Sequence, residues 1–258
     1  MNCIKRLFIG VTFLMVLQTI RASVAEADSA YINDDFLNAA ALYQQAIDSL
    51  GPSAERYYNL GNAYYRAGLL GMAIVSYERA HRIDPSNGDI RDNLEFVRAQ
   101  TKDLIPESDS LFGSAADHVS ANMHPNTWAW IAMCTFILAL AGVAVYFFAN
   151  GVLVRKIGFF GCGLLLIVCV LSNILAYRGT QKVTSSSEAI VVSPSVILST
   201  TPRQPKDRTE EALLLHEGAK VTIIDSLSTG KGMENVWYDV KVDNDHRAWV
   251  QSSAVEII

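Results

Sequence analysis

Two long segments without a charged residue constrain what this chain can fold into. They run from Trp128 to Phe148 and from Ile157 to Tyr177, and each contains 21 residues. A helix of that length reaches about 31 Å, which matches the roughly 30 Å hydrocarbon core of a bilayer. The sequence therefore predicts two transmembrane helices, over 127–149 and 157–177, joined by a loop at 150–156. Two buried helices of a soluble domain are the alternative, which 50% hydrophobic and only 18% charged residues disfavour.

The beginning of the chain has the features of a secretory signal peptide over residues 1–25. Lys5 and Arg6 precede an apolar run from Leu7 to Ile20, and small residues follow at 23–25. The run has 14 residues and reaches about 21 Å as a helix, which is too short to cross a bilayer. An uncleaved membrane anchor is the alternative interpretation.

The distribution of charge predicts which side of the membrane each part occupies. Arg155 and Lys156 lie in the short loop between the spans, and the positive-inside rule places such a loop in the cytoplasm. Arg178 and Lys182 after the second span weaken this count, but a signal peptide independently exports the residues before the first span. We therefore expect both soluble parts of the chain on the non-cytoplasmic side.

Residues 54–85, before the first span, have the pattern of a paired-helix repeat. Tyr57, Leu60, Gly61 and Tyr64 lie at i, i+3, i+4 and i+7, which places them on one face of a helix. Gly68 and Pro85 are expected to end the two helices, and Ser53 and Ser86 to cap helix starts. The order and spacing resemble the tetratricopeptide repeat, whose slots are filled by Tyr57, Leu60, Gly61, Tyr64, Ala73, Tyr77, Ala80 and Pro85.

A shift of 34 residues extends this array in both directions. An earlier repeat, with its first helix near 27–33, is indicated by Ala39, Tyr43 and Ala46. In the forward direction the shift aligns Leu94 with Leu60, so residues 89–101 are predicted to form a capping helix. The helical domain is thus predicted to span 27–102. Because such arrays need about three units to bury a core, two repeats and a cap are expected to lean on a partner or on the membrane.

A second face of the repeat's first helix carries the candidate binding residues. Tyr58, Asn62 and Tyr65 lie at i, i+4 and i+7, away from the core stripe, and Arg66 adjoins them. The resemblance implies that these are concave-face positions, where repeat arrays bind partners. Our hypothesis is that Asn62 bonds the backbone of an extended peptide and that Arg66 meets a carboxylate. The alternative is that all four are consensus-like, solvated residues.

The chain from 188 to 258 is predicted to form a small all-β barrel. A linker at 178–187 precedes it, and a linker at 103–126 joins the helical domain to the first span. Its strand-like runs are separated by turn signals and lie at 189–192, 196–199, 220–225, 237–242, 247–251 and 255–258. Their order resembles bacterial SH3-like domains, which implies binding of peptide or cell-wall peptide. Trp237 and Trp249 are candidates either for the core or for that site. Residues 200–211 are predicted to form a mobile loop beside any groove.

The sequence contains no recognisable catalytic or metal-binding motif. The sequence contains no P-loop, Rossmann, GxSxG or HExxH motif, and its five histidines lack metal-ligand spacing apart from His118 and His124 in a predicted linker. A net charge of −5 disfavours nucleic acid as a partner. We therefore expect no enzymatic activity, no cofactor, no metal ion and no nucleic-acid binding.

The arrangement of these modules carries a further resemblance. A signal peptide, a tetratricopeptide pair, a two-span hairpin and an SH3-like terminus resemble, in that order, the BatE type of aerotolerance-operon protein. The resemblance implies a multidomain protein of the bacterial cytoplasmic membrane, with both soluble domains in the periplasm and membrane partners that carry von Willebrand factor A domains. It also implies a link to oxidative-stress tolerance. We expect a scaffold for a periplasmic complex; a sensor that binds peptidoglycan through the SH3-like domain is the alternative.

Overall fold

The computed structural model describes residues 24–103, 123–184, 187–228, 230, 236–243 and 246–258. These residues form two compact units. The first unit combines the helices before residue 104 with the strands after residue 187, and the second contains the two long apolar helices. The signal peptide predicted at 1–25 lies almost wholly outside the described residues, and so does most of the linker predicted at 103–126.

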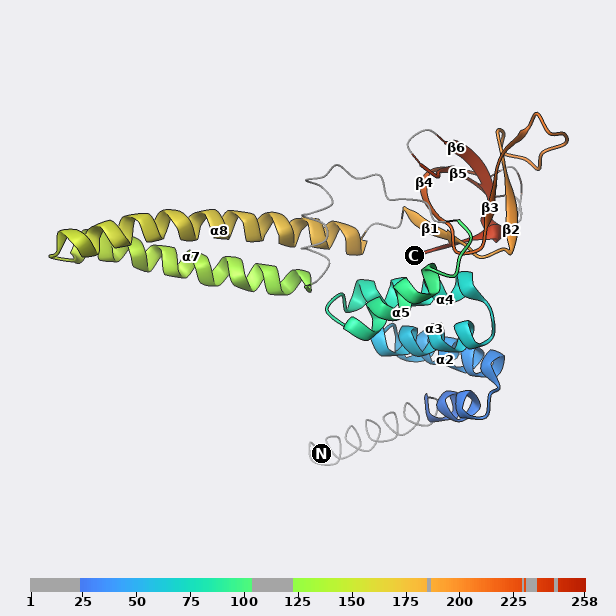
Figure 1. Ribbon diagram of the computed structural model, residues 1–258, viewed down its shortest axis with the longest axis horizontal. Coiled ribbons are helices and arrows are strands. Elements are labelled where there is room, and N and C mark those ends of the chain that lie inside the picture. Colours follow the sequence, from blue (N-terminus) through green and yellow to red (C-terminus); the bar gives the residue numbers. More distant parts are fainter. Residues whose placement is uncertain (1–23, 104–122, 185–186, 229, 231–235, 244–245) are drawn as a thin grey trace, which may run out of the picture. The chain divides into compact units, whose positions relative to one another are not determined.

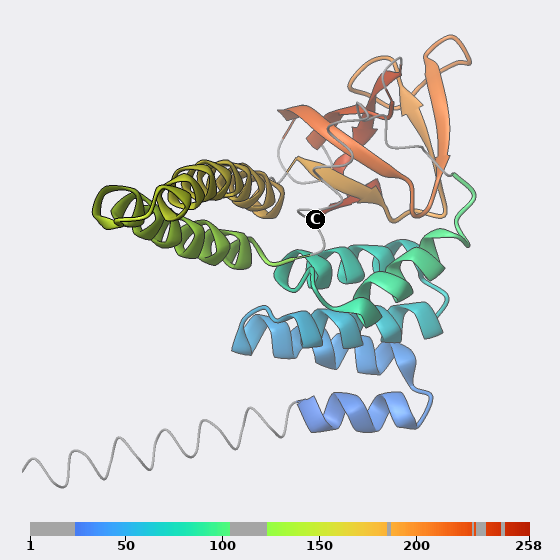
Figure 2. The same cartoon turned by 60° about the vertical axis from the view of Figure 1, so that its left-hand side comes forward.

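The helical part of the first unit is a stack of short helices. A helix at 24–32 is followed by α2 (Phe36–Leu50), α3 (Ala54–Arg66), α4 (Leu70–Ile83) and α5 (Gly88–Arg98). Figure 2 shows these helices lying side by side. The helix pair predicted at 54–85 is present as α3 and α4, and α5 lies where the capping helix was expected.

Turn and cap residues fix where these helices begin and end. Gly68 adopts φ +81° between α3 and α4, a conformation that glycine adopts without strain. The side chain of Ser53 accepts a hydrogen bond from the backbone N–H of Arg56 at 3.2 Å and so caps α3. Asn87, rather than the expected Ser86, caps α5, because its side chain accepts from the backbone N–H of Asp89 at 3.0 Å.

Close packing of α3 on α4 depends on a glycine. A Cβ at Gly61 would lie only 2.7 Å from Cε1 of Tyr77, so the aromatic ring occupies the space that any other residue would fill. Leu60 and Tyr77 are both almost fully buried in this contact region. The small residue in the Leu-Gly slot of the pattern is therefore what allows the two backbones to approach.

The sheet domain contains seven antiparallel strands. They are β1 (Glu188–Val191), β2 (Ser195–Ser199), β3 (Glu211–His216), β4 (Lys220–Ser228), β5 (Val236–Lys241), β6 (Arg247–Gln251) and β7 (Val255–Ile257), with a short 3-10 helix at Ser252–Ala254. Their hydrogen-bonded order is β3-β2-β6-β5-β4-β1-β7 (Figure 1). Alternate residues, among them Val191, Leu198, Val240 and Val250, form the buried core.

The domain is thus an antiparallel sheet, as the strand-like runs predicted, but its ladder does not close. Among the described residues β3 and β7 remain at the two ends, so the closed SH3-like barrel that we expected is not formed. Strand β3 was also absent from our prediction. Its sequence, Glu-Ala-Leu-Leu-Leu-His, has no β-branched residue, and its strand state depends on pairing with β2.

The second unit is a hairpin of α7 (Pro125–Phe148) and α8 (Val152–Thr184). Within the described part of the chain, these two helices are long and apolar enough to cross a membrane, each with a mean hydropathy of 2.4. They pack through glycines: a Cβ at Gly158 would lie 2.9 Å from the carbonyl oxygen of Gly142.

Helix α8 is longer than the span predicted at 157–177. It begins at Val152 and continues through Thr184, so most of the segment expected as a linker at 178–187 is helical. Arg155 and Lys156, expected in the loop, belong to the first turns of α8. The Nε–H of Arg155 donates to the carbonyl oxygen of Ala149 at 2.7 Å and so satisfies an acceptor at the end of α7.

Candidate partner-binding face of the repeat

The four predicted binding residues all come from α3, and each is at least partly exposed. Tyr58 and Asn62 lie beside the neighbouring helices. The hydroxyl of Tyr58 accepts a hydrogen bond from Nδ2 of Asn93 in α5 at 2.7 Å, and its ring lies 5.9 Å from that of Tyr77. The Oδ1 atom of Asn62 accepts from the Tyr77 hydroxyl at 2.6 Å. Both side chains are therefore held in place by the core of the array.

Tyr77 is buried, and burial raises the pKa of its hydroxyl well above the ordinary value, with a smaller contribution from Tyr58. The hydroxyl therefore stays protonated and donates to Asn62. This bond uses the carbonyl oxygen of the Asn62 side chain, which leaves its amide nitrogen as the group that can donate.

Tyr65 faces α5 in the same way. Its ring meets the ring of Phe96 edge-on at 5.8 Å, and its hydroxyl accepts a hydrogen bond from Nε2 of Gln100 at 3.4 Å. Phe96 is 55% exposed although it is a large aromatic residue. The two α5 residues thus extend the predicted site and add an exposed aromatic ring to it.

Arg66 lies on the side of α3 that faces the beginning of α2. Its Nη2 atom lies 3.4 Å from Oδ1 of Asp34, and its guanidinium lies 4.6 Å from the ring centroid of Phe36. The ion pair is exposed and so contributes little to stability. The structure therefore brings Tyr58, Asn62 and Tyr65 together against α5, and it places Arg66 between α3 and the beginning of α2.

The sequence contained a signal for the residues that we missed. A shift of 34 positions carries Asn62 to Phe96 and Arg66 to Gln100 in one direction, and carries Arg66 to Ile32 in the other. Ile32 is 78% exposed. Equivalent positions of successive first helices line one face of such an array. We call the set Ile32, Tyr58, Asn62, Tyr65, Arg66, Phe96 and Gln100 the repeat face.

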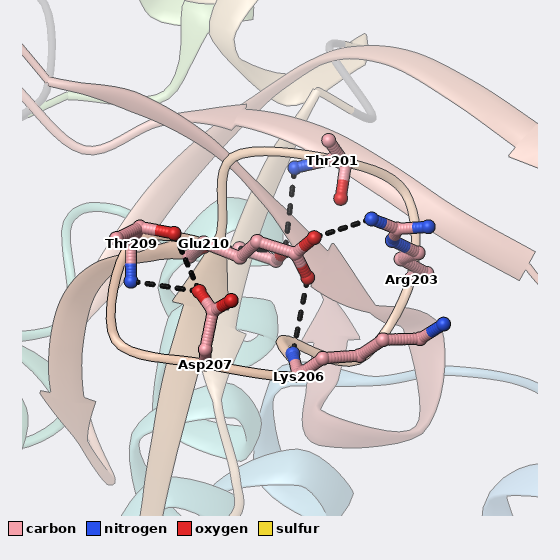
Figure 3. Close-up of polar contacts among 7 residues, drawn as sticks. Thr201, Arg203, Lys206, Asp207, Thr209 and Glu210 are labelled. Carbon is pink, nitrogen blue, oxygen red and sulfur yellow. Dashed lines mark hydrogen bonds and ion pairs between the residues drawn. The ribbon is translucent and has the colours of Figure 1, made fainter.

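The sheet domain offers weaker candidates. Trp237 is 7% exposed and belongs to the interior, whereas Trp249 is partly exposed. The loop between β2 and β3, predicted to be mobile, is held by contacts of its own (Figure 3). The backbone N–H of Lys206 and the Arg203 guanidinium bond to the Glu210 carboxylate and lower its pKa.

Sites for chemistry are not apparent in the described residues. No group of three His, Cys, Asp or Glu side chains in that part of the chain lies close enough to hold a metal ion. An apolar pocket of about 600 Å³ lies on the α7–α8 hairpin. Of the residues that line it, only Tyr146 and Cys162 carry a polar side-chain atom.

Comparison with known proteins supports the interpretation of the helical part as a repeat. The tetratricopeptide repeat family matches residues 54–87. A 62-residue stretch is 36% identical to part of the Protein SGT1 homolog of Oryza sativa subsp. japonica. That stretch covers 24% of this chain and 17% of the rice protein, so the chain spans only a small part of that relative. The chain thus contains a tetratricopeptide repeat, which suggests a scaffold for protein–protein interaction.

Proposed function

We propose that this protein is a membrane-anchored scaffold whose repeat face binds an extended segment of a protein partner. The observation that carries the proposal is the exposed Phe96 beside Tyr65, on a face whose polar side chains are held in position by the core. Exposed aromatic residues next to an arginine are the composition typical of binding hot spots.

The chemistry of the face indicates the kind of partner. Phe96 and Ile32 offer apolar contact, and the Asn62 amide nitrogen offers a donor to a backbone carbonyl. The ion pair of Arg66 with Asp34 is exposed, so a carboxylate of the partner can replace Asp34 at little cost. A peptide segment with an apolar and an acidic side chain fits this face.

The anchoring is part of the same proposal. The two apolar helices supply the membrane hairpin, and the signal peptide together with the basic residues near the hairpin turn places both soluble parts outside the cytoplasm. By resemblance, the membrane is the bacterial cytoplasmic membrane, and the partners are membrane proteins with von Willebrand factor A domains that act in aerotolerance.

Co-purification from detergent-solubilised membranes tests the scaffold. We compare the full-length protein with the pair Arg66→Glu plus Phe96→Ala, and we use Arg91→Glu as the matched control because Arg91 is an exposed arginine of α5 outside the repeat face. Partners should be lost from the double variant and retained with the control. Equal recovery of every partner from all three proteins would refute the proposed face.

Cell-wall binding through the sheet domain is the second candidate. It is favoured by an exposed apolar pair, Ile197 and Leu214, which lie opposite each other in β2 and β3. Co-sedimentation of the full-length protein with purified wall material tests it, with Leu214→Asp as the variant. Binding that Leu214→Asp abolishes would support the sensor, and absence of co-sedimentation would exclude it.

A further inference from the structure

Within the described residues, α5 is the last helix of the repeat array. In a tetratricopeptide array the second helix of each unit covers the preceding pair, yet no helix follows α5 in the described part of the first unit. The apolar residues of α4 and α5 that such a helix would cover are nevertheless buried: Ile74, Val75, Leu94 and Val97 are all less than 5% exposed. Another part of the chain must therefore cover them.

The sheet domain provides that cover. Ile190 of β1 and Ile258, directly after β7, belong to the same buried cluster as Ile74 and Leu94, and Val192 packs against it. Helix α4 contacts both β1 and β7. The helical and the sheet residues of this cluster lie on either side of the α7–α8 hairpin in sequence.

Ion pairs surround this shared core. Nη2 of Arg79 lies 2.7 Å from Oε1 of Glu256 and also donates to the carbonyl oxygen of Ile257 at 2.5 Å. Nη2 of Arg82 lies 2.8 Å from Oε2 of Glu188, whose other oxygen lies 3.0 Å from Nζ of Lys220. The basic residues of α4 thus pair with acidic side chains and with backbone carbonyl groups at the edge of the sheet.

The fit is also steric. A Cβ at Gly71 in α4 would lie 2.7 Å from the carbonyl oxygen of Val191, and a Cβ at Gly218 would lie 2.3 Å from Cγ2 of Thr101. Beyond α5, the Asp103 carboxylate accepts a hydrogen bond from the backbone N–H of His216 at 2.5 Å. Glycine at both contact points lets the sheet approach closer than any side chain would allow.

We infer that the sheet domain caps the described repeat array by packing against α4 and α5, and that this docking holds both segments on one side of any membrane that α7 and α8 cross. A shared core cannot form across a bilayer, and two crossings return the chain to the side from which it started. The capping role does not depend on the proposed function. Only the same-side placement rests on the proposed function, because it assumes that α7 and α8 cross a membrane. Tyr58 and Tyr65 of the repeat face pack against this shared cluster, whereas Ile32, Arg66, Phe96 and Gln100 remain exposed.

Two glycine substitutions, Gly71→Ala and its control Gly88→Ala, test the cap by hydrogen exchange of the full-length protein in detergent. Alanine in place of a helical glycine normally stabilises the helix. Gly88→Ala, whose Cβ would meet only an arginine nitrogen at 3.8 Å, should therefore slow hydrogen exchange or leave it unchanged. Gly71→Ala should instead speed exchange about tenfold in α4, β1 and β7, because the methyl group strikes the Val191 carbonyl. Unchanged or slower exchange in Gly71→Ala would overturn the cap.

A charge exchange gives a second test, which stays informative even if the Gly71→Ala variant does not fold. Arg79→Glu should expose both α4 and the sheet to protease, and Arg79→Glu combined with Glu256→Arg should restore protection. Arg91→Glu, which affects an exposed pair within α5, should change neither. Equal sensitivity of the single and the double exchange would contradict docking through this ion pair.

The membrane consequence is tested by labelling in sealed spheroplasts. In a chain whose other cysteines are replaced, Ser86→Cys and Ser253→Cys place an exposed thiol on each segment. A membrane-impermeant maleimide should label both positions or neither. Labelling of one and protection of the other would overturn the same-side placement but leave the repeat face as a binding site untouched.

Discussion

The hydroxyl of Tyr77 donates a 2.6 Å hydrogen bond to Oδ1 of Asn62 and joins the buried core of the repeat to its candidate binding face. Tyr77 belongs to α4 and Asn62 to α3, so this bond crosses the helix pair that the repeat pattern defines. It fixes the orientation of the Asn62 amide, and with it the direction in which the face can donate to a ligand.

Removing that hydroxyl should weaken both the fold and the binding. Tyr77→Phe leaves Oδ1 of Asn62 without its partner, and the loss of such a partly buried hydrogen bond costs about 1–2 kcal/mol. We expect a lower denaturant midpoint for the helical part and weaker partner binding. Tyr57→Phe, on the opposite face of α3, is the control and should change binding little.

The close approach of α3 and α4 gives a second prediction. Gly61→Ala pushes a methyl group into the Tyr77 ring at 2.7 Å, and overpacking of this kind costs about 1–3 kcal/mol. Gly88→Ala should raise stability by about 0.5–1 kcal/mol, as glycine replacement in open helix positions does. Thermal unfolding followed by circular dichroism compares the two; a stable Gly61→Ala would show that the helices can separate freely.

The repeat could be predicted from the sequence because its signals are local. One face of a single helix is indicated by Tyr57, Leu60, Gly61 and Tyr64. The end of that helix is indicated by Gly68, because glycine readily adopts a positive φ. We did not predict the extension of α8 to Thr184, because we ended the span where the apolar run ends at Tyr177. The residues that follow contain no proline and are compatible with a helix. Asn87 and Ser86 are equally good caps by type, so only the structure distinguishes them.

The sheet was predicted less completely because its order depends on long-range pairing. The β-branched runs around Ile190 and Val240 indicated strands, but β3 carries alanine and leucines that favour a helix in isolation. Nothing local shows that the ladder ends at β3 and β7, or that Ile258 packs against Leu94. We expected a short array to lean on a partner or on the membrane; in our inference the sheet domain of the same chain supplies this support.

Acid should loosen the junction between the array and the sheet. Burial raises the pKa of Glu188, but Lys220 and Arg82 outweigh it, so the net pKa lies below the ordinary value of 4.5. A depressed carboxyl pKa contributes stability above its unfolded-state value, and this contribution is lost as pH falls through the folded-state value. The free energy of unfolding should therefore drop below about pH 4.5.

Urea midpoints at pH 7 and pH 4 measure this effect. Glu188→Gln should lower the midpoint at pH 7 and flatten its dependence on acid. Glu95→Gln, at an exposed position of α5, serves as the control. An unchanged acid dependence in Glu188→Gln would show that other carboxyl groups are responsible.

Alkaline conditions should unfold the helical array. The pKa of Tyr43 is raised by burial and by its hydrogen bond to Asp28, and that of Tyr77 by burial, from an ordinary value of 10.0. A raised pKa contributes stability below the unfolded-state value, which is lost as pH rises above it. Stability should fall above about pH 10, and Tyr43→Phe should reduce that fall. Ultraviolet titration of the tyrosines together with circular dichroism follows both events; ionisation of all tyrosines near pH 10 without unfolding would contradict the burial.

Photocrosslinking from the repeat face tests the scaffold most directly. A photoreactive amino acid at Phe96 in the full-length protein, irradiated in intact cells, should give a discrete protein adduct that Arg66→Glu removes. The same probe at Arg91, also exposed on α5, should give none. Identical adducts from both positions, or no adduct from Phe96 in cells that contain the protein at its normal level, would contradict the account.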